Sequence, residues 1–216
     1  VHWLKQQPNE QEQKDKIEIW KQRLENFSGV LDLPLDKPRP SIASGAGAQY
    51  LFEYDTQLSE KAAKFSSEHS VSLYITLLSN FCILLNRYSK QDDVIVGTPF
   101  ANRANQEDLQ GVVGCFINTL PLATNLADCR NFESVIAEVK SVMFEAYDNQ
   151  DVPLNKIVDA VHPVRDLSYN PLFQVGFIFQ EPPAGIELNG LNSELIPVHS
   201  GGAMYDIHVW IWQKEG

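Results

Sequence analysis

The sequence has few of the features that mark several large protein classes. Its 216 residues include only three cysteines, an odd number without a CxxC spacing, which argues against a disulfide scaffold or a zinc site. Lysine and arginine number 17 against 28 aspartate and glutamate residues, and this net charge of −11 argues against nucleic-acid binding, which needs clustered positive charge. The longest apolar stretch, Val71 to Leu85, is interrupted by polar residues and falls short of the roughly 18–20 residues that span a bilayer.

The remaining composition is that of an ordinary globular protein. Hydrophobic residues make up 44% of the chain and charged residues 21%, so the chain is too apolar to be disordered. Its length is that of one or two domains with a sizeable buried core. The first residues, VHWLKQQPNEQ, lack the apolar region of a signal peptide. We therefore expect a soluble, cytoplasmic protein that spans no membrane.

Familiar catalytic motifs are also missing. The sequence has no GxSxG, HExxH, GxxxxGK[ST] or GxGxxG, so a hydrolytic triad, a zinc centre and a phosphate loop are not predicted. His199 lies in a Gly-rich loop and His208 alternates with apolar residues in a predicted strand; without a partner, each is more often structural than catalytic. No two histidines are adjacent, and they stand at positions His2, His69, His162, His199 and His208.

Helical spacing of apolar residues is the clearest pattern in the chain. The run Asn131–Tyr147 places its apolar residues at i, i+3, i+4 and i+7, which predicts an amphipathic helix. Similar spacing predicts helices over residues 9–27, 58–69 and 72–88, and a short helix that ends near Val161. Prolines after the first helix predict an extended strap, because proline fixes φ and blocks helix continuation.

Alternating or continuous apolar runs predict strands between these helices. In the segment 49–55, Tyr50, Phe52 and Tyr54 alternate with polar residues, which is typical of a strand with one buried face. Because no βαβ period or internal repeat is visible, we predict an α/β fold of the mixed α+β sandwich type, with a mixed sheet covered by helices. The predicted strands are 49–55, 94–97, 112–122, 171–180, 186–198 and 205–213.

Six segments carry a resemblance to a known family. They are LDLPLDKPRP (31–40), DVIVGTPFANR (93–103), VVGCFINTLPL (112–122), NQDVPLNKIV (149–158), RDLSYNPLFQVGF (165–177) and MYDIHVWI (204–211). In this order and with this spacing, they resemble the C-terminal half of the condensation domain of nonribosomal peptide synthetases.

The resemblance implies a chloramphenicol-acetyltransferase-like fold and a role in amide-bond formation. In the family, two such lobes form a V, and phosphopantetheine arms deliver two carrier-bound thioesters through a tunnel between them. The catalytic motif HHxxxDG belongs to the N-terminal lobe and is absent here, so we expect no activity from this chain alone. The implied partners are that N-terminal lobe, donor and acceptor peptidyl carrier proteins and an adjacent adenylation domain. No cofactor is expected to bind directly.

The same resemblance divides the chain and assigns its motif residues. Residues 1–216 would form the C-terminal lobe, with a junction helix and Pro-rich strap over 1–48 and the lobe body over 49–216, cut before the family's final helix. The expected tunnel-facing residues are Gly97, Asn118, Thr119, Gln150, Ser168 and Asn170. The expected structural motif residues are Gly114, Phe116, Asp151, Pro153, Arg165, Asp166, Pro171 and Asp206.

Several of these assignments have simpler structural alternatives. Asn118 and Thr119 either border the tunnel or satisfy neighbouring backbone groups, since buried polar atoms need partners in both cases. Gly97 favours close backbone approach rather than ligand binding. We predict that Asp151 and Arg165 form a structural ion pair that joins two loops.

Asn102 and Arg103 in the next polar loop either meet a phosphopantetheine phosphate or a carrier protein, or belong to a solvated loop, which we favour. Departures from the family pattern leave the substrate and its chirality open: Asn149 replaces a histidine, Leu154-Asn155 replaces Phe-Glu, and Ala123-Thr124 stands where an arginine is common.

Two rival functions remain. Condensation-like domains can serve as noncatalytic recruitment modules. An intact HHxxxDG motif in the other lobe would favour catalysis, whereas a degenerate motif would favour recruitment. A self-contained trimeric acetyltransferase would need its own histidine motif and ranks last.

Overall fold

A computed structural model describes residues 10–103, 111–180, 196 and 198–213. A four-stranded sheet forms its centre, with strand order β2-β1-β3-β4. The strands are β1 (Asp93–Phe100), β2 (Asn118–Asn125), β3 (Val175–Gln180) and β4 (Ile207–Trp212). The helices are α2 (Glu10–Leu24), α3 (Thr56–Glu68), α4 (Leu73–Ser89), α5 (Phe132–Asp148) and α6 (Leu154–Val161).

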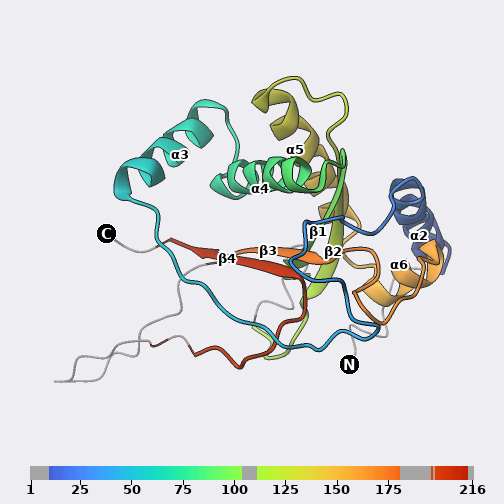
Figure 1. Ribbon diagram of the computed structural model, residues 1–216. Helices are drawn as coiled ribbons and strands as arrows, with labels where there is room; N and C mark the ends of the chain where they lie inside the picture. Colours follow the sequence, from blue (N-terminus) through green and yellow to red (C-terminus); the bar gives the residue numbers. More distant parts are fainter. Residues whose placement is uncertain (1–9, 104–110, 181–195, 197, 214–216) are drawn as a thin grey trace.

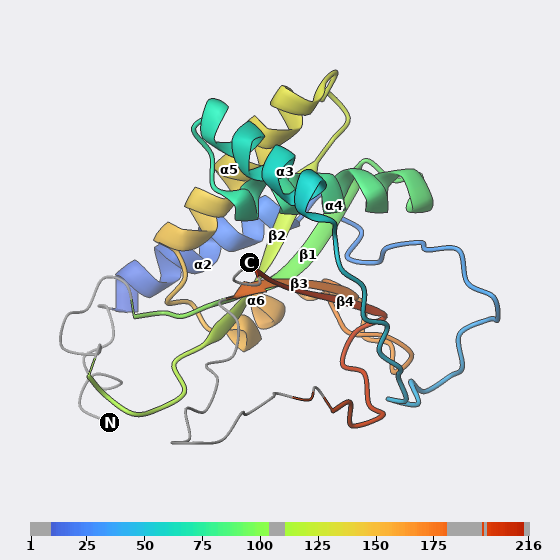
Figure 2. The same ribbon diagram turned by 90° about the vertical axis from the view of Figure 1, so that its left-hand side faces the viewer.

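The sheet is mixed, as predicted. β1 pairs antiparallel with β2 and parallel with β3, and β4 continues in parallel from β3. Helices α3, α4 and α5 lie together over one face, whereas α2 and α6 lie side by side near β2 (Figures 1 and 2). The predicted α/β class with helices over a mixed sheet is confirmed.

The core lies between the sheet and the α4–α5 layer. Phe177 of β3 is 1% exposed, and its ring lies 5.5 Å from that of Phe81 and 5.6 Å from that of Tyr74. The Tyr74 hydroxyl lies 2.7 Å from Oγ1 of Thr98, which in turn donates to the Phe177 carbonyl at 2.8 Å. Burial raises the pKa of Tyr74 and brings that of Cys82 to about 12, so both groups stay protonated in the core.

Local sequence signals begin the helices where they are observed. Asp55, Ser72 and Asn131 cap α3, α4 and α5 by accepting hydrogen bonds from the backbone of the first turn. In α5, Ser134 completes a reciprocal capping box with Asn131. The five predicted helices are confirmed, with ends shifted by a few residues.

The predicted strand over residues 49–55 is wrong. The segment forms no regular secondary structure and joins no sheet, and Tyr50 is 85% exposed. Its aromatic rings contact one another instead, with centroids 6.0 Å apart for Tyr50 and Phe52 and 5.5 Å apart for Phe52 and Tyr54. Alternation of apolar and polar residues therefore does not make this segment a strand, because no described strand pairs with it.

Two further strand predictions were too long. β1 ends at Phe100, opposite Asn118, so residues 112–117 have no partner in β1 and only 118–125 form β2. β3 begins at Val175 rather than 171, because Leu172 has a positive φ of 68° that interrupts the extended backbone. The predicted strand over 186–198 falls almost entirely outside the described residues.

No single described helix is long and apolar enough to cross a membrane. Helices α3 and α4, bent by 108° relative to each other, pass that test only as a pair and only by length and composition.

Candidate functional site

The side chain of Asn118 joins the start of β2 to the loop between α5 and α6. Its Nδ2 donates to the carbonyls of Gln150 at 2.9 Å and Val152 at 2.7 Å. Its Oδ1 accepts from the Leu154 amide at 3.3 Å. Backbone groups thus use every hydrogen-bonding atom of this side-chain amide. This is the alternative in which Asn118 satisfies neighbouring backbone groups. Bordering a tunnel stays a prediction.

Two other predicted tunnel residues lie beside Asn118. Gln150 is buried, and its Nε2 donates to the Tyr147 carbonyl at 2.9 Å, which closes the end of α5. Thr119 is half-buried and lies opposite Pro99 in the β1–β2 ladder. Pro153 occupies the N-cap position of α6. These residues therefore meet around one loop, 149–154.

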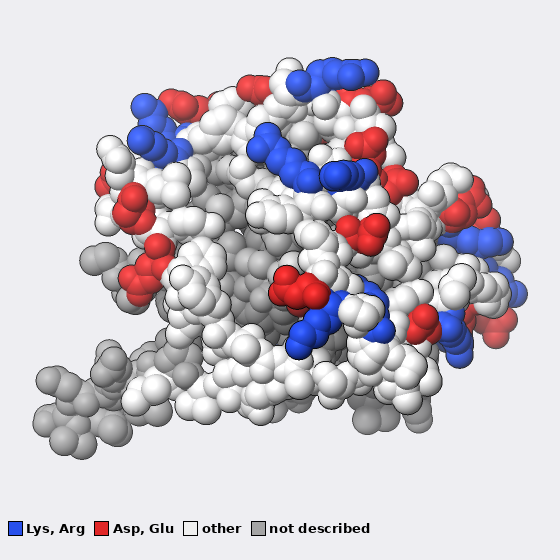
Figure 3. Space-filling view, viewed as in Figure 1, with Lys and Arg blue, Asp and Glu red and all other residues white. Residues whose placement is uncertain are grey.

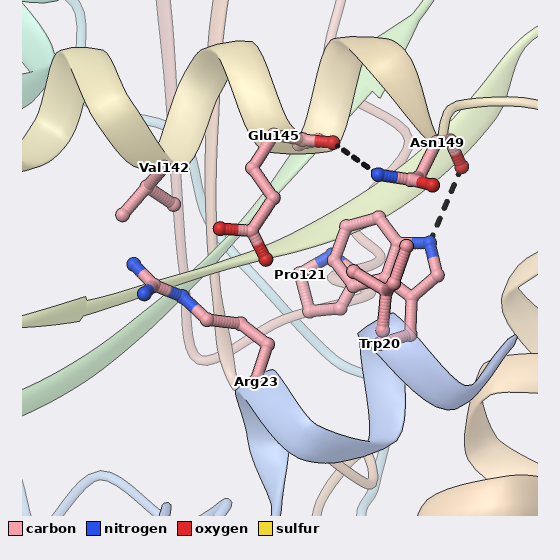
Figure 4. Close-up of a pocket in the computed structure, with 8 residues that line it drawn as sticks. Trp20, Arg23, Pro121, Val142, Glu145 and Asn149 are labelled. Atoms are coloured by element: carbon pink, nitrogen blue, oxygen red, sulfur yellow. Dashed lines mark hydrogen bonds between the residues drawn. The ribbon is translucent and has the colours of Figure 1, made fainter. Parts of the chain in front are cut away.

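Helix α2 is attached to the same loop. Lys16 Nζ lies 2.9 Å from both carboxylate oxygens of Asp151, and Trp20 Nε1 donates to the Asn149 carbonyl at 3.2 Å. Figure 4 shows Trp20 beneath Asn149, whose Nδ2 donates to the Glu145 carbonyl at 2.8 Å. The loop thus connects the N-terminal helix to the sheet.

The predicted ion pair between Asp151 and Arg165 is wrong. Asp151 pairs with Lys16, and Arg165 lies 3.6 Å from Asp159 instead. Arg165 follows α6 directly, and its exposed side chain reaches back to that helix rather than across to the loop. Sequence spacing could not show that Lys16, about 135 residues earlier, faces Asp151.

The turn over residues 165–171 is fixed by local contacts. Asp166 Oδ1 accepts from the Ser168 amide at 2.7 Å, and hydrogen bonds from Ser168 lower the pKa of the carboxyl. Asn170 Nδ2 donates to the Met204 carbonyl, which ties the turn to the approach of β4. Pro171 then leads into the buried Leu172. The contacts of Ser168 and Asn170 are thus with the chain itself.

Asp206, immediately before β4, pairs with the strap, by which we mean the proline-containing chain from Gly29 to Gly47. Its Oδ1 accepts from Arg39 Nη1 at 3.0 Å, and its Oδ2 from Arg39 Nη2. The hydrogen bond with Asp206 raises the pKa of Arg39. This bidentate pair joins Asp206 to the chain that follows α2.

A row of closely packed residues crosses the sheet next to an aromatic cluster. Gly97, Gly176 and His208 are lateral neighbours on β1, β3 and β4. A side chain at Gly97 would overlap the Phe173 ring, and one at Gly176 would overlap His208. Gly97 is thus needed for close packing, as its structural alternative proposed.

His208 contacts two aromatic rings in partly exposed surroundings. Its ring centroid lies 5.1 Å from that of Tyr205 and 5.2 Å from that of Trp210. Partial burial lowers the pKa of His208, so its imidazole is neutral at pH 7. Among the described residues, no carboxylate orients this imidazole as the acid of a catalytic pair would.

Arg103 organises the loop that precedes β2. Its guanidinium donates to the carbonyls of Val112 at 2.8 Å and Gly114 at 2.6 Å and lies 4.2 Å from the centroid of the Phe116 ring. These contacts place Gly114 and Phe116 against the Arg103 side chain. A contact between Arg103 and a phosphate stays a prediction.

The surface around these elements carries apolar side chains and mixed charge. Acidic and basic residues are interspersed over the face drawn in Figure 3, so neither sign forms a continuous patch there. Among the described residues, no cluster of three His, Cys, Asp or Glu could hold a metal ion. Exposed apolar side chains of the motif segments and their neighbours are Val112, Val113, Ile117, Val164, Leu167, Met204, Ile207 and Trp210.

Comparisons with known proteins place these features in context. A family model described as Condensation domain matches residues 1–216. The chain is 39% identical over 207 residues to a linear gramicidin synthase of Brevibacillus parabrevis, covering 93% of this chain and 4% of that protein. It is 33% identical over 210 residues to bacitracin synthase 1 of Bacillus licheniformis, covering 97% and 4%. The chain thus spans only a small part of these relatives.

Solved structures share its fold. A complex of the X-domain and OxyB from teicoplanin biosynthesis matches with a TM-score of 0.82 and 25% identity, over 94% of this chain and 44% of that chain. The four-domain nonribosomal peptide synthetase AB3403, bound to AMP and glycine, matches with a TM-score of 0.87 and 23% identity, over 97% and 17%.

Proposed function

Because the chain belongs to the condensation-domain family and has its chloramphenicol-acetyltransferase-like fold, we propose that it is the C-terminal lobe of a peptide-synthetase condensation domain. In this proposal residues 1–48 hold the junction helix and strap, and residues 49–216 form the lobe body. The family match over residues 1–216 carries the proposal. The match to about 44% of the X-domain chain supports it, since one lobe is about half of a two-lobe domain.

The proposed reaction is amide-bond formation between two carrier-bound thioesters. The α-amine of the acceptor attacks the donor thioester carbonyl, a C–N bond forms, the C–S bond breaks and the donor pantetheine thiol leaves with a proton. The lobe would supply one wall of the tunnel and part of the carrier-docking surface. The family's histidine motif, in the other lobe, would handle the amine proton.

The apolar surface near β4 supports the wall assignment. Leu167 and Met204 are each 73% exposed, and the Asn170–Met204 hydrogen bond holds their two segments together. Exposed apolar side chains from joined segments favour a surface that another protein part covers. The proposed cover is the N-terminal lobe, and the proposed further partners are donor and acceptor carrier proteins and the adjacent adenylation domain.

A dipeptide assay tests this function. Donor and acceptor carrier proteins, loaded through their phosphopantetheine arms, are mixed either with the intact two-lobe domain or with residues 1–216 alone. We expect dipeptide from the intact domain and none above background from the single lobe. Turnover by the single lobe comparable with that of the intact domain would overturn the proposal.

Noncatalytic recruitment is the second candidate function. The similarity to an X-domain solved in complex with OxyB favours it, because that domain is a condensation-like fold with a bound partner. An intact two-lobe domain that forms no dipeptide, yet binds an enzyme acting on the carrier-bound peptide in a pull-down with purified proteins, would favour recruitment over condensation.

A further inference from the structure

Two glutamine side chains hold the strap at residues 29–32. Gln174 Oε1 accepts from the Leu31 amide at 2.8 Å, and its Nε2 donates to the Gly29 carbonyl at 2.8 Å. Gln91 Oε1 accepts from the Asp32 amide at 2.7 Å, and its Nε2 donates to the Val30 carbonyl at 3.1 Å. Each amide therefore pairs with the strap as a neighbouring strand's peptide group would.

Gln174 differs from Gln91 in burial and in reach. Gln174 is 1% exposed, and its Nε2 also donates to the Asn170 carbonyl at 2.8 Å, so its amide is fully used. The main-chain carbonyl of Gln174 accepts from the Asp206 amide at 2.8 Å and from the Ile207 amide at 3.4 Å. One residue thus links the strap, the 165–171 turn and the first residues of β4.

The strap meets the approach to β4 at two more places. Arg39 binds Asp206 through both carboxylate oxygens. The Gly47 amide donates to the Gly201 carbonyl and the Ala203 amide to the Gly45 carbonyl, each at 2.8 Å. The strap and residues 201–207 are therefore joined directly at Arg39 and at Gly45 and Gly47, and the buried Gln174 connects them at Gly29 and Leu31.

We propose that Gln174 is a positioning residue: it couples the strap to β4 and so fixes the Tyr205–His208–Trp210 cluster on the exposed side of the sheet. The two residues whose amides donate to the Gln174 main-chain carbonyl, Asp206 and Ile207, lie between Tyr205 and His208 of this cluster. Any effect on catalysis rests on the proposed function, whereas the coupling itself does not.

The chemistry of the amide makes this proposal specific. Replacing Gln174 by methionine keeps the shape but leaves the Leu31 amide buried without its acceptor, and it removes the donor that the carbonyls of half-buried Gly29 and exposed Asn170 share. Replacing it by glutamate keeps the acceptor but sets a carboxylate against two carbonyls. Protonation restores one donor, so a glutamate here should have a raised pKa and hold the strap better in acid.

Hydrogen exchange in the 216-residue chain tests the coupling. In Q174M we expect protection factors at Leu31, Asp206 and Ile207 to fall by about tenfold or more, with those of α5 unchanged. In the matched control Q91M, protection should fall at Asp32 and stay unchanged at Asp206. Unchanged protection at Asp206 and Ile207 in Q174M, or an equal loss throughout the chain, would overturn the proposal.

Q174E keeps the proposal testable where Q174M fails to fold. We expect its protection factors at Leu31 and Asp206 to be several-fold higher at pH 5 than at pH 8, a change that wild-type chain and Q91E do not show. Equal protection at the two pH values would contradict the proposed role.

The dipeptide assay separates this proposal from the proposed function. In the intact domain, Q174M should lower kcat about tenfold and leave KM for the loaded carriers unchanged, whereas Q91M should change neither by more than about twofold. Wild-type kcat retained in Q174M would overturn the catalytic part. An inactive wild-type domain whose exchange pattern follows the prediction would refute only the proposed function.

Discussion

The two faces of the sheet are held by different combinations of apolar packing and polar contacts. On the helix-covered side, α4 and α5 pack on β1 and β2 through residues such as Val96 and Leu120, which are fully buried. On the strap side, Leu31 and Leu33 are also buried in the core, but side-chain amides and the Arg39–Asp206 pair add directional contacts, and Trp210 of β4 stays 51% exposed. Apolar packing is nondirectional, whereas polar contacts fix positions. The helix-covered side therefore relies mainly on apolar packing, whereas the strap side adds contacts that fix geometry.

The largest expected effect lies on the helix-covered side. Phe177→Ala should lower the free energy of unfolding by about 3–5 kcal/mol, because it removes the ring that packs on Phe81 and Tyr74 and leaves a cavity. Trp210→Ala, on the exposed side of β4, should cost less than about 1 kcal/mol. Urea denaturation measures both, and similar losses would break the comparison between the two sides.

The Asn118 contacts should have an intermediate effect. Asn118→Ala removes three hydrogen bonds to the 150–154 backbone and should destabilise the chain by about 1–3 kcal/mol. The matched control is Asn155→Ala on the exposed face of α6, which should change stability by less than about 0.5 kcal/mol. Equal effects of the two substitutions in urea denaturation would show that the Asn118 contacts do not join β2 to this loop.

The corrected ion pairs predict a smaller difference. Asp151→Asn breaks the partly buried pair with Lys16 and should cost about 0.5–1 kcal/mol, whereas Arg165→Ala should cost at most about 0.5 kcal/mol. Thermal unfolding at low and high salt measures this, and the Asp151 effect should shrink as salt rises. A larger loss of stability for Arg165→Ala than for Asp151→Asn would favour the Asp151–Arg165 pair predicted from the sequence.

The smallest effect concerns pH on the exposed side of β4. Since partial burial lowers the pKa of His208, the unfolded chain binds a proton more readily than the folded one. Stability contributed by His208 is therefore present above its ordinary pKa of about 6.5 and is lost as pH falls below that value. His208→Phe should remove this part of the pH dependence of stability. An imidazole titration midpoint above about 6.5, measured by NMR in the folded chain, would contradict the lowered pKa of His208.

The features that could be predicted from the sequence are those that depend on a local residue pattern, such as the helices. The α5 run carries its apolar period and its Asn131–Ser134 cap within a few residues, so its bounds were predictable. The segment 49–55 has an equally clear alternation, yet whether a strand pairs depends on a neighbour that the pattern does not contain. Local rules thus specify conformation, and long-range pairing decides the sheet.

The same distinction between local pattern and long-range contact applies to the site residues. The motif segments located the loop around Asn118 and the turn before β3, because family resemblance preserves order along the chain. Their contacts were less predictable: Lys16 rather than Arg165 faces Asp151, across some 135 residues. Gln174 and Gln91 were missed, since a glutamine side chain carries no charge and no periodic signal. Only the fold brings the strap to them.

Native-state hydrogen exchange of the wild-type chain, read residue by residue, tests the central contrast most directly. We predict that amides within β1, β2, α4 and α5 exchange only through global unfolding. Those of Leu31, Ala43 and Gly47, whose acceptors are Gln174, Leu167 and Gly201, should exchange through smaller, local openings. Equal protection of the two groups would contradict the account, because the strap side would then be part of the same cooperative core.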